Sequence, residues 1–233
     1  AGYTDDRIIL IVEDDIADNV SNPNKGVIQV TIGGNNVYEN VEIDYRMSSL
    51  KAKDILAILN GEKSESLPTV IESTENDNLF VFWSGHGVPG AMCWDEEPYA
   101  MTGDDLSTVF KDMNLKRRYR KLLMMVEACF SGGVMEQCEG IPGMLFITAA
   151  NGDETSKADV FNGEMKVWMS NRFTSTFIEQ ITDNKDVAMR DLYYRLFINT
   201  VGSHVMVYNA ENYGNLYSAN MSEFINFKND KSK

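Results

Sequence analysis

The sequence predicts an α/β protein whose central sheet is mostly parallel and is sandwiched by helices. Two observations carry this prediction. Apolar runs of strand length recur along the chain, and segments with apolar residues at helical spacing separate them. These runs are continuous rather than alternating, which is typical of parallel strands buried on both faces. No repeat or linker divides the 233 residues, so we expect a single domain over 1–233.

The first part of the chain contains a strand, a hairpin and a helix in this interpretation. Residues 7–12 (RIILIV) form a compact apolar run that predicts a buried strand. Residues 27–32 and 36–41 flank a Gly-Gly-Asn turn, a pattern that predicts a hairpin. Residues 51–60 place apolar side chains on one helical face, and Gly61 is a natural end for that helix.

The rest of the chain supplies most of the predicted sheet. Thr102 and Asp105 match a capping box, and apolar residues at helical spacing follow them. Two later segments also have helical spacing, 173–181 and 187–200. The remaining apolar runs are predicted strands, at 79–83 (LFVFW), 122–126 (LLMMV), 144–149 (MLFITA) and 204–208 (HVMVY).

Composition excludes several classes of function. The chain has 21 Lys and Arg against 35 Asp and Glu, a formal net charge of −14, which opposes binding to nucleic acid. No apolar run approaches the roughly 18–20 residues of a membrane span. Three cysteines and two histidines, without a Cys-x-x-Cys, argue against a metal site. We therefore expect no cofactor and no metal.

One histidine and one cysteine stand out by their position. His86 follows the predicted strand 79–83, and Cys129 follows the predicted strand 122–126. Ligands bind at the carboxyl ends of such strands, so both side chains are expected at one edge of the sheet. Each residue alone is more often structural than reactive. Together, with Gly87 and Gly132 allowing close backbone approach, they indicate a thiol nucleophile and its proton-transfer partner.

These motifs resemble the caspase-like cysteine peptidases of clan CD, and the legumain (asparaginyl endopeptidase) and GPI-transamidase family in particular. The likeness rests on a strand followed by Gly-His-Gly, then a strand followed by Glu-Ala-Cys-x-Ser-Gly. It covers most of the chain and implies a caspase-like fold. Further blocks occur in the same order, at 14–17, 22–27, 37–45, 55–61, 148–156 and 203–208.

The resemblance implies a cysteine endopeptidase that acts on a peptide or protein substrate. Cys129 would be the nucleophile and His86 the proton-transfer partner, and the backbone N–H groups of Gly87 and Cys129 would form the oxyanion hole. A transamidase or peptide ligase would use the same thioester. A pseudoenzyme that binds without catalysis is the alternative from another class, and the presence of both His86 and Cys129 argues against it.

The resemblance also assigns a pocket for the P1 side chain. Glu127 would line this S1 pocket, together with Thr155 and Ser156. Asn171 falls where legumains have an S1 aspartate, and residues 171–174 are closer to the transamidase branch. The implied P1 residue is Asn, with Lys or Arg as the less favoured alternative.

One departure from the family concerns its first strand and helix, which have no counterpart before residues 7–12. We expect a cut before Ala1, with the missing strand carried by a separate N-terminal chain. If the chain is such a processed form, a secreted, periplasmic or lysosome-like compartment is favoured.

Four other features have plain structural interpretations. His204 is expected to be structural, at the start of a buried strand. Cys93 and Cys138 are expected to be free thiols, although a bond between them stays open. The acidic run at 95–97 is expected to be a solvated turn.

Overall fold

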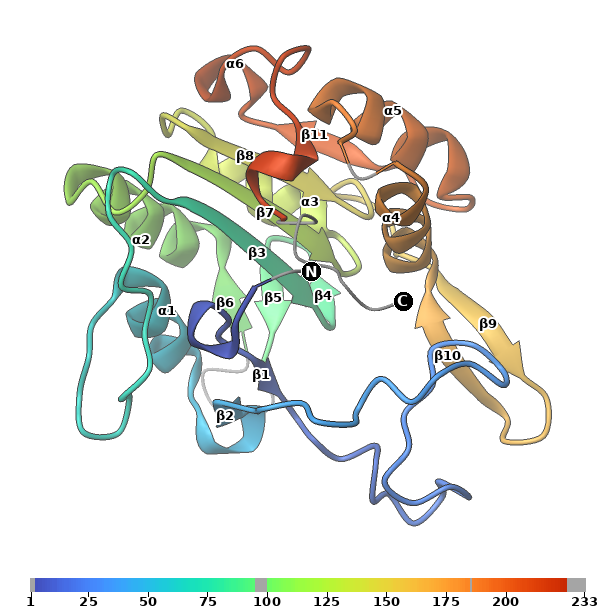
Figure 1. Ribbon diagram of the computed structural model, residues 1–233. Helices are drawn as coiled ribbons and strands as arrows, with labels where there is room; N and C mark the ends of the chain where they lie inside the picture. Colours follow the sequence, from blue (N-terminus) through green and yellow to red (C-terminus); the bar gives the residue numbers. More distant parts are fainter. Residues whose placement is uncertain (1–2, 95–99, 185, 226–233) are drawn as a thin grey trace.

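The computed structural model describes residues 3–94, 100–184 and 186–225. At its centre lies a four-stranded sheet in the order β11-β8-β7-β3 (Figure 1). Strands β3 (Asn78–Ser84), β7 (Lys121–Glu127) and β8 (Met144–Thr148) are parallel. Strand β11 (Met206–Tyr208) is antiparallel to β8. The predicted α/β class with a mostly parallel sheet is therefore confirmed.

Helices cover both faces of this sheet (Figure 1). Leu122, Met124 and Val126 of β7 pack in one apolar cluster with residues of α1 (Ala52–Asn60) and α2 (Gly103–Leu115). Leu123 and Met125 pack in a second cluster with residues of α4 (Arg172–Asp183) and α5 (Met189–Asn199). Because successive side chains of a strand point to opposite faces, only a continuous apolar run can fill both clusters.

The predicted helix ends are confirmed at α1 and α2. Helix α1 ends at Gly61, whose φ of 69° is left-handed and therefore suits glycine. At the start of α2 the Thr102 hydroxyl accepts the Asp105 N–H at 3.2 Å, and the Asp105 carboxylate accepts the Thr102 N–H at 2.9 Å. These two bonds are the capping box expected from the sequence.

Short elements complete the described chain. They are η1 (Asp5–Arg7), β1 (Ile11–Val12), β2 (Tyr45–Arg46), η2 (Met47–Ser49), β4 (Gly87–Val88), β5 (Ala91–Cys93), β6 (Ala100–Thr102), α3 (Ser131–Met135), η3 (Glu136–Cys138), β9 (Ala158–Asn162), β10 (Val167–Asn171), α6 (Ala210–Tyr213) and η4 (Met221–Glu223), where η marks a 3-10 helix. Strands β4 to β6 form one antiparallel sheet, and β9 and β10 form a hairpin.

Two predictions about the first part of the chain are wrong. The hairpin at 27–41 is absent, and those residues form turns and bends. The Asn36 side-chain oxygen accepts a hydrogen bond from the Ile28 N–H at 3.0 Å, in place of a strand partner. Ile32 is 65% exposed, so no buried face stabilises a pair of strands there. The buried strand at 7–12 is also reduced to β1, which pairs only with β2, outside the central sheet.

Strand β3 is an edge strand among the described residues, because it pairs with β7 on one side only. Its side chains are half-buried to exposed, and Phe82 is 37% exposed, so the expectation of a strand buried on both faces is wrong. None of the helices in the described ranges is long and apolar enough to cross a membrane. The expected turn at 95–97 lies outside the described residues.

Candidate active site

His86 and Cys129 lie at the same edge of the central sheet. Strands β3 and β7 run parallel in a register that sets Ser84 beside Glu127, and each of the two residues lies two positions beyond its strand. The Gly85 N–H continues the ladder by donating to the Glu127 carbonyl at 3.1 Å. His86 is exposed and Cys129 is half-buried. The predicted juxtaposition of the two loops is therefore present.

Gly87 brings the backbone of the two loops into contact. A Cβ atom at Gly87 would lie 2.1 Å from the carbonyl oxygen of Cys129, a distance that no side chain tolerates. Strands β4 and β5 hold this approach, since the Cys93 N–H donates to the His86 carbonyl at 2.9 Å. A glycine after the histidine is thus required by the close packing of the two turns.

The turn that carries Cys129 is fixed by the loop after β8. Phe130 adopts a left-handed conformation with φ of 56°, and its N–H donates to the Glu154 carbonyl at 2.8 Å. The Gly132 N–H donates to the Ala150 carbonyl at 3.1 Å. Within the described residues the Cys129 N–H has no acceptor, so a donor is left free beside the thiol.

Glu127 places a buried carboxylate two residues before the thiol. Glu127 is only 2% exposed. One of its carboxylate oxygens, Oε2, accepts hydrogen bonds from both the N–H and the hydroxyl of Thr174, each at 3.0 Å. Thr174 lies in the first turn of α4, where a negative charge is stabilised by the helix dipole. The other oxygen, Oε1, is buried and has no hydrogen-bond partner among the described residues. A buried polar oxygen without a hydrogen-bond partner is uncommon in a folded protein.

The burial of Glu127 predicts a specific pH dependence of stability. Burial raises the pKa of Glu127 above its ordinary value of 4.5, and the two Thr174 donors oppose the rise only in part. The folded protein therefore binds this proton more tightly than the unfolded chain. Its contribution to the free energy of unfolding is complete below pH 4.5 and is lost as the pH rises through the raised pKa.

Glu127→Gln removes this titration, so the variant should gain stability relative to the parent protein as the pH rises. The test is thermal unfolding of both proteins from pH 4 to pH 8. The control is Glu179→Gln, an exposed position on α4, the helix that carries Thr174. A difference in Tm between Glu127→Gln and the parent that does not change with pH would contradict the assignment.

Comparison with known proteins decides the family. The peptidase C13 family profile matches residues 1–224. The chain belongs to the peptidase C13 family.

Three relatives of this C13 chain illustrate the likeness. The legumain of Rattus norvegicus is 29% identical over 214 residues, which cover 89% of this chain and 48% of that protein. The hemoglobinase of Schistosoma mansoni is 31% identical over 238 residues, covering 96% and 52%. The vacuolar-processing enzyme of Vicia sativa is 35% identical over 161 residues, covering 66% and 32%. The chain spans about half the length of the legumain and hemoglobinase relatives.

The fold of this C13 chain is caspase-like. The structure of caspase-1 from Spodoptera frugiperda superposes with a TM-score of 0.52 at 12% sequence identity, covering 92% of this chain and 88% of caspase-1. At that identity the likeness concerns the fold alone. It confirms the architecture that the motifs around His86 and Cys129 implied.

The residues expected to line the S1 pocket of this C13 chain are only partly brought together. Ser156 lies beside the thiol, with its Oγ 3.9 Å from the Cys129 Sγ. Asn171 is the last residue of β10 and directly precedes α4. The N–H of Arg172 donates to the Lys157 carbonyl at 2.8 Å, so Asn171 lies at the base of the β9–β10 hairpin, which begins shortly after Ser156.

Thr155 lies next to Ser156 in the loop between β8 and β9. It is exposed, and its hydroxyl accepts a hydrogen bond from the Lys157 ammonium at 2.9 Å. The structure thus places Ser156 beside the thiol and Thr155 at the surface, and Glu127 lies at the end of β7, two residues before Cys129. All three cysteines are free. Within the described ranges, no group of three His, Cys, Asp or Glu side chains forms a metal-binding cluster.

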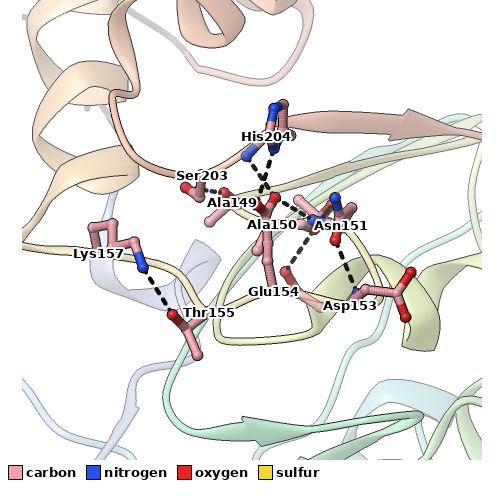
Figure 2. A network of polar contacts seen from close by, with 11 residues as sticks. Ala149, Ala150, Asn151, Asp153, Glu154, Thr155, Lys157, Ser203 and His204 are labelled. Atoms are coloured by element: carbon pink, nitrogen blue, oxygen red, sulfur yellow. Dashed lines mark hydrogen bonds and ion pairs between the residues drawn. The ribbon is translucent and has the colours of Figure 1, made fainter.

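Sequence reasoning missed two features of this C13 site. Thr174, which holds Glu127, is 47 positions away in sequence, and only its place at a helix start could have suggested it. Glu154 binds His204 across 50 positions (Figure 2). His204 was expected at the start of a buried strand, but it is exposed and precedes β11, so that placement was wrong.

Proposed function

We propose that this chain is a cysteine endopeptidase domain in which Cys129 is the nucleophile and His86 transfers protons. The observation that carries the proposal is the meeting of the two loops at one sheet edge, where Gly87 touches the backbone of Cys129. These two adjacent loops carry a half-buried thiol, an exposed imidazole and a backbone N–H without an acceptor among the described residues. This is the set of groups that acyl transfer from a peptide bond requires.

The reaction follows from these groups. His86 accepts the proton of the Cys129 thiol, and the sulfur attacks the carbonyl carbon of the scissile bond. The N–H groups of Gly87 and Cys129 stabilise the oxyanion. As the oxyanion collapses, the C–N bond breaks and His86 donates a proton to the departing amine. A thioester remains on Cys129. Water then adds to it, gives its proton to His86, and releases the carboxylic acid and the free thiol.

The same thioester could be resolved by an amine, which would make the domain a transamidase or ligase. Product analysis by mass spectrometry with an added amine nucleophile, such as hydroxylamine or glycinamide, separates the two chemistries. Peptidase activity predicts the free acid as the main product, and a predominant amide product would favour the transamidase. A pseudoenzyme would form neither product and would leave the thiol unmodified by a substrate-like electrophile.

We infer that Glu127 selects a P1 side chain with N–H donors. Thr174 donates both of its hydrogen bonds to Oε2, and the buried Oε1 of this residue, two positions before the thiol, has no partner among the described residues. The family resemblance favours Asn, and simple charge attraction would favour Lys or Arg. An apolar P1 side chain would leave the buried oxygen without any partner, which costs free energy.

A panel of peptides that differ only at P1 tests this inference. Asn should give the highest kcat/KM, and Glu127→Gln should lower that value about 10- to 100-fold, the range expected for one lost hydrogen bond to a charged group. The reason is that a neutral amide has one acceptor oxygen, which Thr174 would occupy. Glu179→Gln, on an exposed face of α4, is the matched control. Clear preference for an apolar P1 would contradict the role of Glu127.

We further propose that another strand pairs with the free edge of β3 in the active protein. The edge carries backbone N–H and C=O groups without ladder partners among the described residues, next to the partly exposed Phe82. Such an edge is a template for pairing with another segment. A separate polypeptide that supplies this strand and a helix is the occupant implied by the family resemblance.

Mass spectrometry of the purified active protein under denaturing conditions tests this proposal. A second polypeptide of roughly 30 residues or more, the size of a strand with its crossover helix, is expected beside the 26.2 kDa chain. A single 26.2 kDa species with full activity would contradict it.

A further inference from the structure

Glu154 and His204 form a polar pair beside the candidate active site (Figure 2). The Glu154 Oε1 accepts the backbone N–H of His204 at 2.6 Å and that of Asn151 at 3.1 Å. Its Oε2 lies 2.9 Å from the His204 Nδ1. One carboxylate therefore joins the loop after β8 to the segment that leads into β11.

The same residue also holds the turn of the nucleophile. The Glu154 carbonyl accepts the N–H of Phe130, which follows Cys129 directly. Two residues further on, the Ser156 hydroxyl lies beside the Cys129 sulfur. A displacement of Glu154 would therefore move the backbone on which Cys129 sits and the side chain next to its sulfur.

Stability alone does not account for this pair. The His204 side chain is 67% exposed, and exposed ion pairs contribute only about 0–1 kcal/mol. The Ser203 hydroxyl also donates to the Ala149 carbonyl at 2.7 Å, so the two segments stay attached without the pair. Partial burial would raise the pKa of Glu154, but the His204 and Asn151 donors outweigh it and lower the pKa, which keeps the carboxylate ionised.

We propose that Glu154 and His204 are positioning residues for the reaction, and that their contact fixes the Cys129 turn and Ser156 in the reactive geometry. This proposal rests on the proposed peptidase function for the role of Cys129. The pair would act on the reaction indirectly, because neither side chain forms a hydrogen bond with His86 or Cys129 in the described contacts. A shift of the nucleophile by about 1 Å can lower a rate about 100-fold.

The experiment compares His204→Ala with His204→Asn in the active protein. The Ala variant removes the side-chain contact, whereas an Asn side chain can donate an N–H to the Glu154 Oε2 from the place of Nδ1. We expect kcat to fall about 10- to 100-fold in His204→Ala, with a small change in Tm. His204→Asn should restore kcat to within about threefold of the parent protein. Rescue by Asn distinguishes a positioning contact from general loss of packing.

The matched control breaks another exposed ion pair, in which Arg117 lies 3.3 Å from Glu75. Arg117 precedes β7 and Glu75 precedes β3, so this pair lies at the opposite end of the strands from Cys129. Arg117→Ala should leave kcat unchanged. The proposal is overturned if His204→Ala keeps kcat within about threefold of the parent, or if His204→Asn is as impaired as His204→Ala.

Hydrogen exchange of the Phe130 amide, resolved by NMR, gives a readout that does not depend on turnover. The amide should exchange faster in His204→Ala than in the parent and in His204→Asn. Its acceptor is the Glu154 carbonyl, and in the Ala variant the Glu154 carboxylate keeps the backbone N–H donors of Asn151 and residue 204 but loses the His204 side-chain contact. Unchanged exchange would overturn the proposal even if the parent protein hydrolysed no peptide. Absence of turnover in the parent protein would instead count against the peptidase function itself.

Discussion

Cys129→Ala is expected to abolish peptide turnover while leaving the fold intact. Cys129 is the only thiol among the described residues between β7 and α3, and Ser131, the hydroxyl at the start of α3, is fully buried. Only one half-buried sulfur atom is lost, so the free energy of unfolding should change by about 1 kcal/mol or less. The rate of hydrolysis of a fluorogenic peptide and the Tm measure the two expectations.

Cys93→Ala is the matched control for this variant. Cys93 is also half-buried and free, and it lies in β5, whose backbone supports His86 but whose thiol has no assigned role. It should keep nearly full activity. Near-normal turnover in Cys129→Ala would end the peptidase account, whatever the control shows.

His86→Ala is expected to lower kcat by at least about 100-fold, the usual scale of general acid–base catalysis. Without the imidazole, the amine must leave without a proton donor, and the attacking thiol loses its proton acceptor. The exposed side chain has no hydrogen bond from its ring within the described contacts, so its removal should hardly change the Tm. Single-turnover kinetics with an amide substrate give the rate of the acylation step directly. A loss smaller than about tenfold would remove His86 from the mechanism.

The sheet could be predicted from sequence because its buried strands need apolar residues at every position. Runs such as LLMMV in β7 fill clusters on both faces, and no helix or exposed strand would place them so. Helices α1 and α2 were predictable because their ends carry local signals, the left-handed Gly61 and the Thr102 capping box. Local signals of this kind survive without knowledge of the rest of the fold.

The residues of the missing hairpin lacked a surface to cover them, whereas Ile9 and Ile11 of the reduced first strand pack against the core cluster. Ile32 and Val37 remain exposed, and local side-chain bonds from Asn36 replace a ladder. The direction of β11 likewise depends on the path of the chain after α5, which no strand pattern encodes. The edge position of β3 depends on which segments are present beside it.

The candidate site shows the same division. Cys129 and His86 could be found because each follows an apolar strand directly. The residues that hold the site could not, since Thr174 reaches Glu127 and His204 reaches Glu154 only through the folded chain. Thr155, which the resemblance assigns to the S1 pocket, is exposed, and its hydroxyl accepts a hydrogen bond from the Lys157 ammonium.

Labelling with a thiol-reactive electrophile carried on a peptide with Asn at P1, followed by peptide mapping, tests the central claim most directly. The chain has three thiols, and the account predicts rapid modification of Cys129 alone. Cys138 is buried, which raises its pKa to about 12, so it should stay unmodified. Labelling at Cys129 that is slowed in His86→Ala is the predicted result. Labelling of Cys93 with Cys129 left unmodified would contradict the account.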